Sequence, residues 1–240
     1  MSVLVISEIG VNHGGSESEA HSLIAEAKVS GADCVKLQLF KPELFPASQQ
    51  KMLEKLQLPL QSYKNLNKYC SVIGMKFAVT AFDCDSLEWL LKNTNMAFIK
   101  IASPSIHDKK LLAVAATAKK PIVISTGMCE YKDMTAAERI LRGCDITFLW
   151  CVSQYPTPSE KARLKKMIDL KRMMQRPVGI SDHSGDIFVP LAAVAMGAKT
   201  VECHLTMSKD LLGPDHKSSL EPQQFKQMVT GIRILEKALA

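Results

Sequence analysis

The sequence lacks the features that would place the protein in a membrane or outside the cell. No stretch approaches the ~18 uninterrupted apolar residues of a membrane span. The amino terminus runs into an apolar segment without a basic leader or a small-residue cleavage site, so a secretory signal is not expected. The seven cysteines form no C-x-x-C pair, which is typical of reduced thiols. We therefore expect a cytoplasmic protein.

Charge and composition further narrow the class of protein and of binding partner. The 30 Lys and Arg residues against 24 Asp and Glu give a formal net charge of +6, spread along the chain. This surplus suits a small anionic substrate and does not indicate nucleic acid. The 47% hydrophobic and 22% charged residues argue against disorder, collagen and coiled coil. With no linker or low-complexity segment, residues 1–240 are predicted to form a single domain.

Short apolar runs alternate with longer amphipathic segments along the chain. Each run is near-continuously apolar and a few residues long, as expected of parallel strands buried on both faces. The runs are Val3–Ile9, Cys34–Phe40, Lys76–Phe82, Phe98–Ala102, Ile122–Thr126, Ile146–Val152, Val178–Ser181 and Thr200–Thr206.

The segments between these runs have recognisable helix starts. Ser16, with Glu19 three residues later, predicts a capping box. Asp108 and Ser159 are expected to open two further helices, because apolar residues at helical spacing follow each of them. Pro222 predicts the first turn of the last helix.

The spacing of the strand ends separates two architectures. From Glu8 to His204 the eight ends are on average about 28 residues apart, close to the roughly 30 residues of a βα unit. Eight such units predict an α/β protein with a (β/α)8 TIM-barrel fold. A doubly wound open sheet is the alternative, but the first turn, residues 10–15, lacks the G-x-G-x-x-G pattern typical of that fold.

Polar side chains follow the apolar part of every run. In a barrel, the carboxyl ends of the strands form the active face, and repetition around the ring favours a site over loop boundaries. The polar set is Glu8, Lys36, Gln38, Thr80, Lys100, Ser103, Ser125, Ser153, Tyr155, Ser181, Asp182, His183, Glu202 and His204.

Lys36 and Lys100 lie inside apolar strands, where an isolated buried ammonium is costly. Both point into the barrel if their apolar neighbours face the helices. Together with the strand-end hydroxyls, the two cations predict a cradle for a phosphate and a carboxylate. A lysine that reaches the rim, or one that forms a Schiff base, is the alternative interpretation.

His183 and His204 end neighbouring strands, which lie about 4.8 Å apart in a parallel sheet. Two imidazoles at that separation can share a divalent ion, with a carboxylate or water completing its coordination. Because soft ligands are absent, Mn²⁺ or Mg²⁺ is expected rather than structural zinc; a simply hydrogen-bonded histidine is the alternative. Cys203 is expected to face the helices. Three carboxylates lie nearby in sequence: Asp182, Glu202 and Asp215.

Eight short segments occur in order at these strand ends: Ser7–His13, Val35–Gln38, Lys100–Ser103, Ser125–Met128, Ser153–Pro156, Gly179–His183, Glu202–His204 and Gly213–His216. Together they resemble the N-acetylneuraminate (sialic acid) synthase family, over essentially the whole chain. That family condenses phosphoenolpyruvate with an N-acylated amino sugar. The resemblance therefore implies a transferase that makes a nonulosonic, sialic-acid-like 2-keto sugar acid.

The resemblance also implies a role for each candidate residue. Glu8 would stabilise positive charge on the enol-ether carbon and orient the water that adds there, and phosphate would leave by C–O cleavage. His183 and His204 would bind a divalent metal that polarises the open-chain sugar aldehyde. Asp215 and Tyr155 would contact sugar hydroxyls. Phosphoenolpyruvate would be held by Lys36, Thr80, Lys100, Ser103, Ser125, Ser153 and Ser181, with Gln38 alongside.

The chain departs from the family pattern in two ways. Family members usually carry a Glu that meets the sugar where this sequence has Ser105. They also commonly carry a C-terminal antifreeze-like domain, whose arginine reaches the sugar of a partner subunit. We therefore expect a homodimer, a separate polypeptide that supplies the domain, a substrate that needs no such arginine, or a fragment. No nucleic-acid or membrane partner is expected.

Two other functions stay open from the sequence. A related phosphoenolpyruvate–aldose synthase would make a shorter keto sugar acid, although the Gly213–His216 turn disfavours it. A non-catalytic barrel that binds a sugar or an anion is motivated by Ser105 and by the domain that the family has and this chain does not show.

Overall fold

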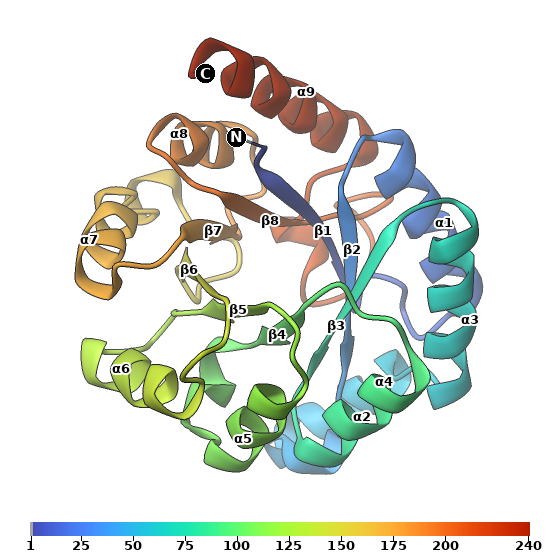
Figure 1. The fold of residues 1–240 in the computed structure, drawn as a ribbon. Helices are drawn as coiled ribbons and strands as arrows, with labels where there is room; N and C mark the ends of the chain where they lie inside the picture. The colour runs from blue at the N-terminus through green and yellow to red at the C-terminus, as the bar shows by residue number, and fades with distance from the viewer. Residues whose placement is uncertain (1) are drawn as a thin grey trace.

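Eight parallel strands form a closed barrel in the computed structural model, which describes residues 2–240. Each strand pairs with its neighbours in sequence, and β1 pairs with β8 to close the ring, which the helices surround (Figure 1). The predicted (β/α)8 barrel is confirmed. The strands are β1 (Leu4–Gly10), β2 (Cys34–Leu39), β3 (Lys76–Ala81), β4 (Ile99–Ile101), β5 (Ile122–Ser125), β6 (Ile146–Cys151), β7 (Val178–Asp182) and β8 (Thr200–His204).

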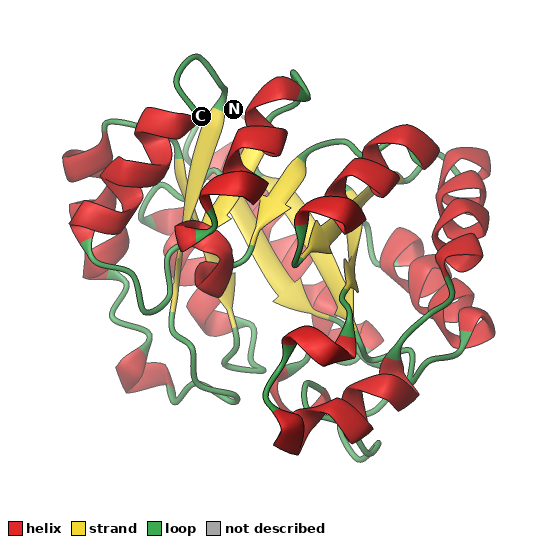
Figure 2. Ribbon diagram, turned by 90° about the horizontal axis from the view of Figure 1, so that it is seen from below, coloured by secondary structure: helices red, strands yellow, loops and turns green. Residues whose placement is uncertain are grey.

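Helices pack around the outside of the strands, as the side view shows (Figure 2). None of the described helices is long and apolar enough to cross a bilayer. The α-helices are α1 (Glu17–Val29), α2 (Ala47–Leu56), α3 (Leu60–Val72), α4 (Cys84–Asn93), α5 (Lys109–Thr117), α6 (Tyr131–Ile140), α7 (Lys165–Met174), α8 (Phe188–Ala195) and α9 (Pro222–Ala238). Short 3₁₀ helices are η1 (Pro42–Leu44), η2 (Ser103–His107), η3 (Ser159–Lys161) and η4 (His216–Ser218).

The predicted helix starts at Ser16 and Asp108 are confirmed. The Ser16 hydroxyl accepts a hydrogen bond from the Glu19 backbone N–H at 3.3 Å. The Ser16 N–H donates to the His13 carbonyl instead of to Glu19, so only half of the expected capping box forms. The Asp108 carboxylate accepts from the backbone N–H of Lys110 at 3.0 Å and also from that of the following residue. Each contact satisfies an N–H at a helix start that has no partner within the helix.

Two helical features differ from the sequence expectations. Ser159 begins only η3, and α7 starts later at Lys165, because Arg163 between them has a left-handed φ of 47° that interrupts a helix. Helix α2 was not predicted. None of its residues is buried, so no core-facing pattern marks it in the sequence. Pro222 does open α9, as expected.

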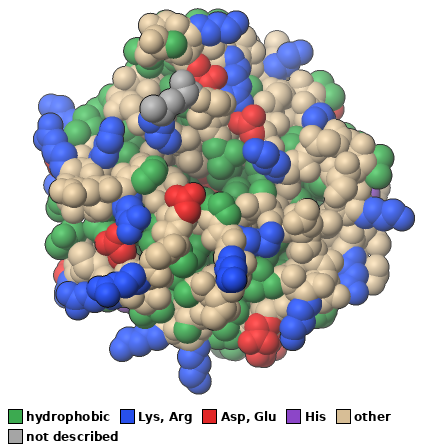
Figure 3. Space-filling view, in the orientation of Figure 1, with side chains coloured by type: hydrophobic (Ala, Val, Ile, Leu, Met, Phe, Trp, Pro, Cys, Tyr) green, Lys and Arg blue, Asp and Glu red, His purple; other side chains and the backbone are tan. Residues whose placement is uncertain are grey.

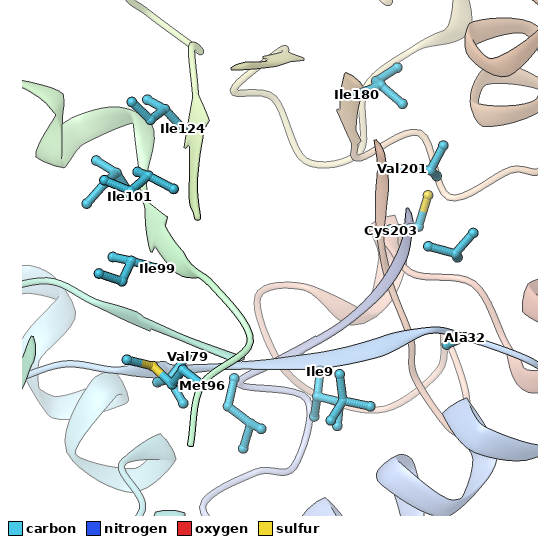
Figure 4. Packing of buried hydrophobic residues seen from close by; sticks show 14 of the residues in the cluster. Ile9, Ala32, Val79, Met96, Ile99, Ile101, Ile124, Ile180, Val201 and Cys203 are labelled. Atoms are coloured by element: carbon cyan, nitrogen blue, oxygen red, sulfur yellow. The ribbon is translucent and has the colours of Figure 1, made fainter. Parts of the chain in front are cut away.

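Residues alternate between the inside and the outside of the barrel along every strand. Outward side chains join the large core between strands and helices; Figure 4 shows Ile99, Ile101, Val201 and Cys203 in this layer, so the prediction for Cys203 is confirmed. Inward side chains at the start of the strands form a separate apolar plug. The plug comprises Ile6, Cys34, Ala78, Phe98, Val123 and Leu149.

The two ends of the chain lie side by side, next to α8 and α9 (Figure 1). The Arg233 guanidinium on α9 contacts Asp33 Oδ2 at 2.6 Å and donates to the Val3 carbonyl at 2.9 Å. Asp33 Oδ2 also accepts from the Val5 N–H at 2.7 Å. These bonds fasten the last helix to the first strand, where the ring closes.

The face of the barrel seen in Figure 1 carries lysines and arginines around its periphery and near its centre (Figure 3). Hydrophobic and uncharged atoms separate most of these cations on this face. The net charge of +6 is thus distributed rather than gathered into one continuous basic surface here.

Candidate active site

A cavity of about 540 Å³ opens at the carboxyl end of the barrel, above the apolar plug. Strand alternation brings the next inward residues of the strands to its floor, and the loops that follow form its walls. Every site residue proposed from the sequence lines this cavity: Glu8, Lys36, Gln38, Thr80, Lys100, Ser103, Ser125, Ser153, Tyr155, Ser181, His183, His204 and Asp215.

The two lysines point inward, as predicted, and each contacts a carboxylate. Lys36 Nζ lies 2.6 Å from Glu8 Oε2 and donates to Thr80 Oγ1 at 2.9 Å. Lys100 Nζ lies 3.2 Å from Glu202 Oε1. All of these side chains are buried. The floor of the cavity therefore holds two ammonium groups and two carboxylates whose formal charges cancel.

Hydroxyl groups complete this ionic network. Lys100 Nζ donates to Ser125 Oγ at 2.7 Å, and Ser181 Oγ donates to Glu202 Oε1 at 2.9 Å. Lys36 Nζ also lies 3.8 Å from the other Glu202 oxygen. Glu202 thus links the two halves of the floor. Sequence reasoning placed Glu202 near the histidines, whereas the structure pairs it with the lysines.

Burial and neighbouring charges set the protonation of these groups in different ways. Burial lowers the pKa of Lys100, even though the Glu202 carboxylate opposes the change. For Lys36, burial is outweighed by the carboxylates of Glu202 and Glu8, and its pKa is raised. Burial likewise disfavours the charged form of Glu202, but the two lysines overcome it and hold its pKa below the ordinary value. Lys36 and Glu202 are therefore charged at neutral pH.

Glu8, one of the two carboxylates of the floor, is contacted at both of its oxygens. Gln38 Nε2 donates to Glu8 Oε1 at 3.0 Å while Lys36 contacts the other oxygen. The backbone of Gln38 is itself fixed, because Tyr63 Oη donates a hydrogen bond to its carbonyl oxygen at 2.6 Å. The Glu8 carboxylate is consequently fixed at both oxygens and has a defined orientation.

A second group of hydroxyls gathers around Gly127, in the loop after β5. The Gly127 N–H donates to Ser103 Oγ at 2.9 Å and to Cys151 Sγ at 3.0 Å. A Cβ at this position would lie 2.4 Å from Ser153 Oγ, so any larger residue would have to displace the Ser153 side chain. The close approach brings Ser103 and Ser153 together on one side of the cavity.

His183 and His204 lie beside each other, as expected from neighbouring strands, with ring centroids 5.6 Å apart. His183 Nδ1 lies 3.0 Å from the Val152 carbonyl, which can only accept, so this nitrogen carries the proton. His183 Nε2 then accepts from Tyr155 Oη at 2.8 Å. Burial lowers the pKa of His183 to about 3, so the ring is neutral.

These donors fit a divalent metal ion in chemical type. His204 Nδ1 is buried without a hydrogen-bond partner and lies 3.8 Å from Asp215 Oδ2. The neutral His183 ring has its one lone pair on Nε2, which accepts from Tyr155 Oη and would have to leave that bond to ligate a metal ion. Imidazole suits divalent first-row transition metals, and carboxylate and water also suit Mn²⁺, so the donor set is compatible with a divalent cation. Within residues 2–240, no three such side chains already converge on one point, so water would have to complete the coordination.

The loop after β1 passes between the acidic and imidazole groups. Gly10 has a φ of +56°, and a Cβ there would lie 3.2 Å from both Asp215 Oδ2 and His204 Cε1 and 3.3 Å from Glu8 Oε1. A side chain at this position would thus push apart three site residues. Gly10, the last residue of β1, is the feature of the sequence that permits this close approach.

One expectation about an individual residue is wrong. Asp182 does not line the cavity with the histidines. It has the parity of Val178 and Ile180, faces away from the barrel axis, and accepts from Ser184 Oγ at 2.6 Å. Burial raises the pKa of Asp182 to about 6. Ser105 is buried in η2 and does not line the cavity, so it presents no hydroxyl there.

The outer wall of the cavity was not anticipated. It comes largely from α2 and from Phe45, which lies between η1 and α2; the α2 residues are Gln49, Met52 and Leu53. The spacing of Gln49, Met52 and Leu53 is i, i+3, i+4, so they share one face of α2. This face covers a cavity and not a core, which is why its pattern predicted no buried helix.

Comparisons with known proteins agree with this geometry. The sequence model of the NeuB family matches residues 23–240. An N,N'-diacetyllegionaminic acid synthase of Campylobacter jejuni is 37% identical over 98% of this chain and 77% of its own length. Human N-acetylneuraminate-9-phosphate synthase is 32% identical over 98% of this chain and 70% of its own.

A solved structure has the same fold throughout. It is the N-acetylneuraminic acid (sialic acid) synthetase of Leptospira borgpetersenii, crystallised in complex with citrate. The match covers 100% of this chain and 86% of that one, with a TM-score of 0.96 and 30% sequence identity. All three proteins are named as enzymes that synthesise acidic sugars.

Proposed function

The chain belongs to the NeuB family and is an enzyme of the transferase type, and from this premise we propose its reaction. It condenses phosphoenolpyruvate with the open-chain aldehyde of an N-acylated amino sugar, giving a nonulosonic 2-keto sugar acid and phosphate. One observation carries the proposal. Two buried ammonium groups, hydroxyls, two imidazoles and the fixed Glu8 carboxylate share one cavity.

Phosphoenolpyruvate binds on the floor, where Lys36 and Lys100 have hydroxyl neighbours that can turn their protons toward an anion. The remaining hydroxyls of the floor and of the Gly127 cluster hold the phosphate and carboxylate oxygens. These ligands are Thr80, Ser103, Ser125, Ser153 and Ser181, with Gln38 alongside.

Charge balance supports a divalent cation beside the substrate. Because the floor is formally neutral, the two or three negative charges of phosphoenolpyruvate at neutral pH are not offset by Lys36 and Lys100 alone. His183 and His204 would hold the ion, with Asp215 as the nearest carboxylate. When bound, it would supply Lewis-acid polarisation of the aldehyde oxygen.

The protein groups then serve a sequence of bond changes. The enol carbon of phosphoenolpyruvate attacks the aldehyde carbon and forms the C–C bond, which leaves positive charge on the enol-ether carbon. Glu8, held at both oxygens, stabilises that charge and orients the water that adds to this carbon. The bond between this carbon and the phosphate oxygen then breaks, and the two protons of the added water pass to the former aldehyde oxygen and to the departing phosphate, which leaves the keto acid and phosphate. Asp215 and Tyr155 contact sugar hydroxyls.

The test is phosphate release with phosphoenolpyruvate, Mn²⁺ and a panel of N-acyl hexosamines. Release that requires both phosphoenolpyruvate and an N-acyl hexosamine supports the proposal, and release with other aldoses alone indicates a related synthase. Binding of phosphoenolpyruvate without release with any aldose identifies a non-catalytic barrel. Borohydride trapping of a covalent adduct on a lysine would establish Schiff-base chemistry instead.

A further inference from the structure

We propose that Asn12 is a positioning residue that sets the separation between the His204 imidazole and the Asp215 carboxylate. Asn12 lies in the loop after β1, is buried, and does not line the cavity. The inference rests on the proposed function, because that function assigns His204 and Asp215 to the place where the sugar reacts. It goes beyond that function, because none of the reaction steps described above uses Asn12.

Asp215 is carried by a loop, residues 206–219, whose two ends are joined next to His204. Leu205 and Leu220, which flank the loop, form an isolated parallel bridge. The Leu220 N–H also donates to the His204 carbonyl at 2.8 Å. The ends of the loop therefore have fixed positions, whereas the position of Asp215 depends on contacts made within the loop and to its neighbours.

The Asn12 amide contacts both parts of this segment. Its Nδ2 donates to the Leu205 carbonyl at 2.8 Å and to Ser219 Oγ at 2.8 Å. Ser219 Oγ in turn donates to the Asp215 carbonyl at 2.7 Å. Because a backbone carbonyl can only accept, the direction of every hydrogen bond in this series is fixed. One amide group thus connects the residue that follows His204 with the backbone of Asp215.

Asn12 is itself held in place by the loop after β1. The Asn12 N–H donates to the Ile9 carbonyl at 2.9 Å. The Gly14 N–H donates to the Val11 carbonyl, also at 2.9 Å. Two successive turns of the backbone therefore surround Asn12, and its side chain extends from a main chain of defined conformation.

The spacing of the imidazole and the carboxylate needs such external support. His204 Nδ1 lies 3.8 Å from Asp215 Oδ2, which is longer than a hydrogen bond, so a direct bond does not hold the two groups together. Asn12 fixes the backbone at both groups instead. An asparagine suits this role because its amide nitrogen carries two protons, one for each acceptor, whereas a carboxylate carries none.

Crystal structures of the wild type and of Asn12→Leu test the spacing directly. Leucine has the same branching as asparagine but no donor, so the variant loses both hydrogen bonds. We expect the distance between His204 Nδ1 and Asp215 Oδ2 to change by about 0.5 Å or more, while Lys36 and Lys100 stay in place. An unchanged distance overturns the inference and leaves the proposed function standing.

Ser219→Ala interrupts only the branch that reaches Asp215, and it provides a milder variant. We expect kcat/KM for an N-acyl hexosamine to fall about tenfold, with the Kd of phosphoenolpyruvate, measured by calorimetry, unchanged. Ser30→Ala is the matched control. Ser30 is also buried, and its hydroxyl donates to the Pro222 carbonyl at 3.3 Å, near the amino end of β2. Equal effects of the two variants, or weaker phosphoenolpyruvate binding in Ser219→Ala, would indicate a purely structural role and overturn the inference.

A double-mutant cycle with Asp215→Asn tests the route of the effect. If Ser219 acts through the Asp215 carboxylate, Ser219→Ala should lower kcat/KM by less than about threefold once Asp215→Asn has removed the charge. Effects that multiply in the double variant would mean that Ser219 acts elsewhere, and would overturn the inference. A wild type that releases no phosphate with any N-acyl hexosamine overturns the proposed function, whereas the crystallographic comparison still decides whether Asn12 sets the spacing.

Discussion

Variants of Lys100 separate two effects of this side chain: its contribution to substrate binding and its effect on the stability of the buried ionic network. Its ammonium contacts Ser125 and Glu202 inside the barrel. We expect Lys100→Met to weaken phosphoenolpyruvate binding by about 1.5–3 kcal/mol, the worth of a charge-assisted hydrogen bond. Titration calorimetry with phosphoenolpyruvate measures the loss. Lys41→Met, the same change outside the cavity, should leave the affinity unaltered.

A second variant distinguishes lost binding from lost folding. Lys100→Met leaves Glu202 with Lys36 as its remaining ion partner, at 3.8 Å, so the free energy of unfolding should also fall. Adding Glu202→Gln removes the uncompensated carboxylate and should restore much of that stability, but not the affinity. Recovery of both together would mean that Lys100 acts through structure alone.

His204 is the residue that tests the metal. Its Nδ1 is buried without a hydrogen-bond partner, so His204→Ala breaks no hydrogen bond of that atom and should preserve the fold. The phosphate release of this variant should no longer depend on added Mn²⁺. Phosphate release, measured across a Mn²⁺ titration after chelation, reports the change. Wild-type activity that survives chelation undiminished would remove the metal from the mechanism.

Gly10 tests how closely the three site residues around it must approach. Gly10→Ala places a Cβ 3.2–3.3 Å from atoms of Glu8, His204 and Asp215, which is closer than an ordinary van der Waals contact. The positive φ costs about 1–2 kcal/mol of stability, and a shift of the reacting groups by up to 1 Å can lower kcat about 10²-fold. Thermal unfolding and steady-state kinetics measure the two effects. A kcat equal to that of the wild type would mean that the crossing has no catalytic importance.

Individual site residues were predictable where strand alternation decides their direction. Lys36 and Lys100 alternate with apolar residues that face the helices, so their inward direction follows from the sequence. Asp182 obeys the same alternation, yet it was grouped with the histidines because it adjoins His183 in sequence. The pairing of Glu202 with Lys100 joins strands far apart in the chain, and no local pattern encodes it.

At the scale of elements, α9 closes the ring through Arg233. Its bonds to Asp33 and to the Val3 carbonyl connect the last helix to the first strand. The Arg233 side chain is 29% exposed, so after allowance for solvent screening we expect Arg233→Met to lower the free energy of unfolding by about 1–2 kcal/mol. Kinetic constants should not change, because the contact lies at the end of the barrel opposite the cavity.

Urea unfolding of Arg233→Met measures this contribution. Arg172→Met, an exposed arginine on α7, is the matched control and should change stability by less than about 0.5 kcal/mol. Equal effects of the two variants would show that the closure contact stabilises no more than an ordinary surface charge.

The strands were readable from the sequence and part of the helical layer was not. Buried parallel strands such as Ile122–Ser125, which Pro121 precedes, are apolar on both faces, so they appear in the sequence as short continuous apolar runs. Helix α2 packs over the cavity, and its apolar face is short and exposed. The sequence pattern therefore did not identify it as a helix that faces the core. Its discovery in the structure is what defines the outer wall.

At the scale of the whole molecule, closure of the barrel assembles the site. Glu8 on β1 and His204 on β8 are nearly 200 residues apart in sequence, yet they are paired across the closing edge. The groups proposed to bind phosphate and metal consequently meet in one cavity, although no single segment contains both. The order of the motifs along the chain does not by itself show that these groups meet. The sequence predicted this convergence because it predicted the barrel fold.

The most direct test of the proposed reaction follows one oxygen atom. The protein is incubated with an N-acyl amino sugar, Mn²⁺ and phosphoenolpyruvate that carries ¹⁸O in the bridge between carbon and phosphorus, and both products are analysed by mass spectrometry. C–O cleavage predicts a keto sugar acid without the label from the bridge and inorganic phosphate that carries it. Label retained in the keto acid, or phosphoenolpyruvate recovered unchanged with every sugar, would contradict the account.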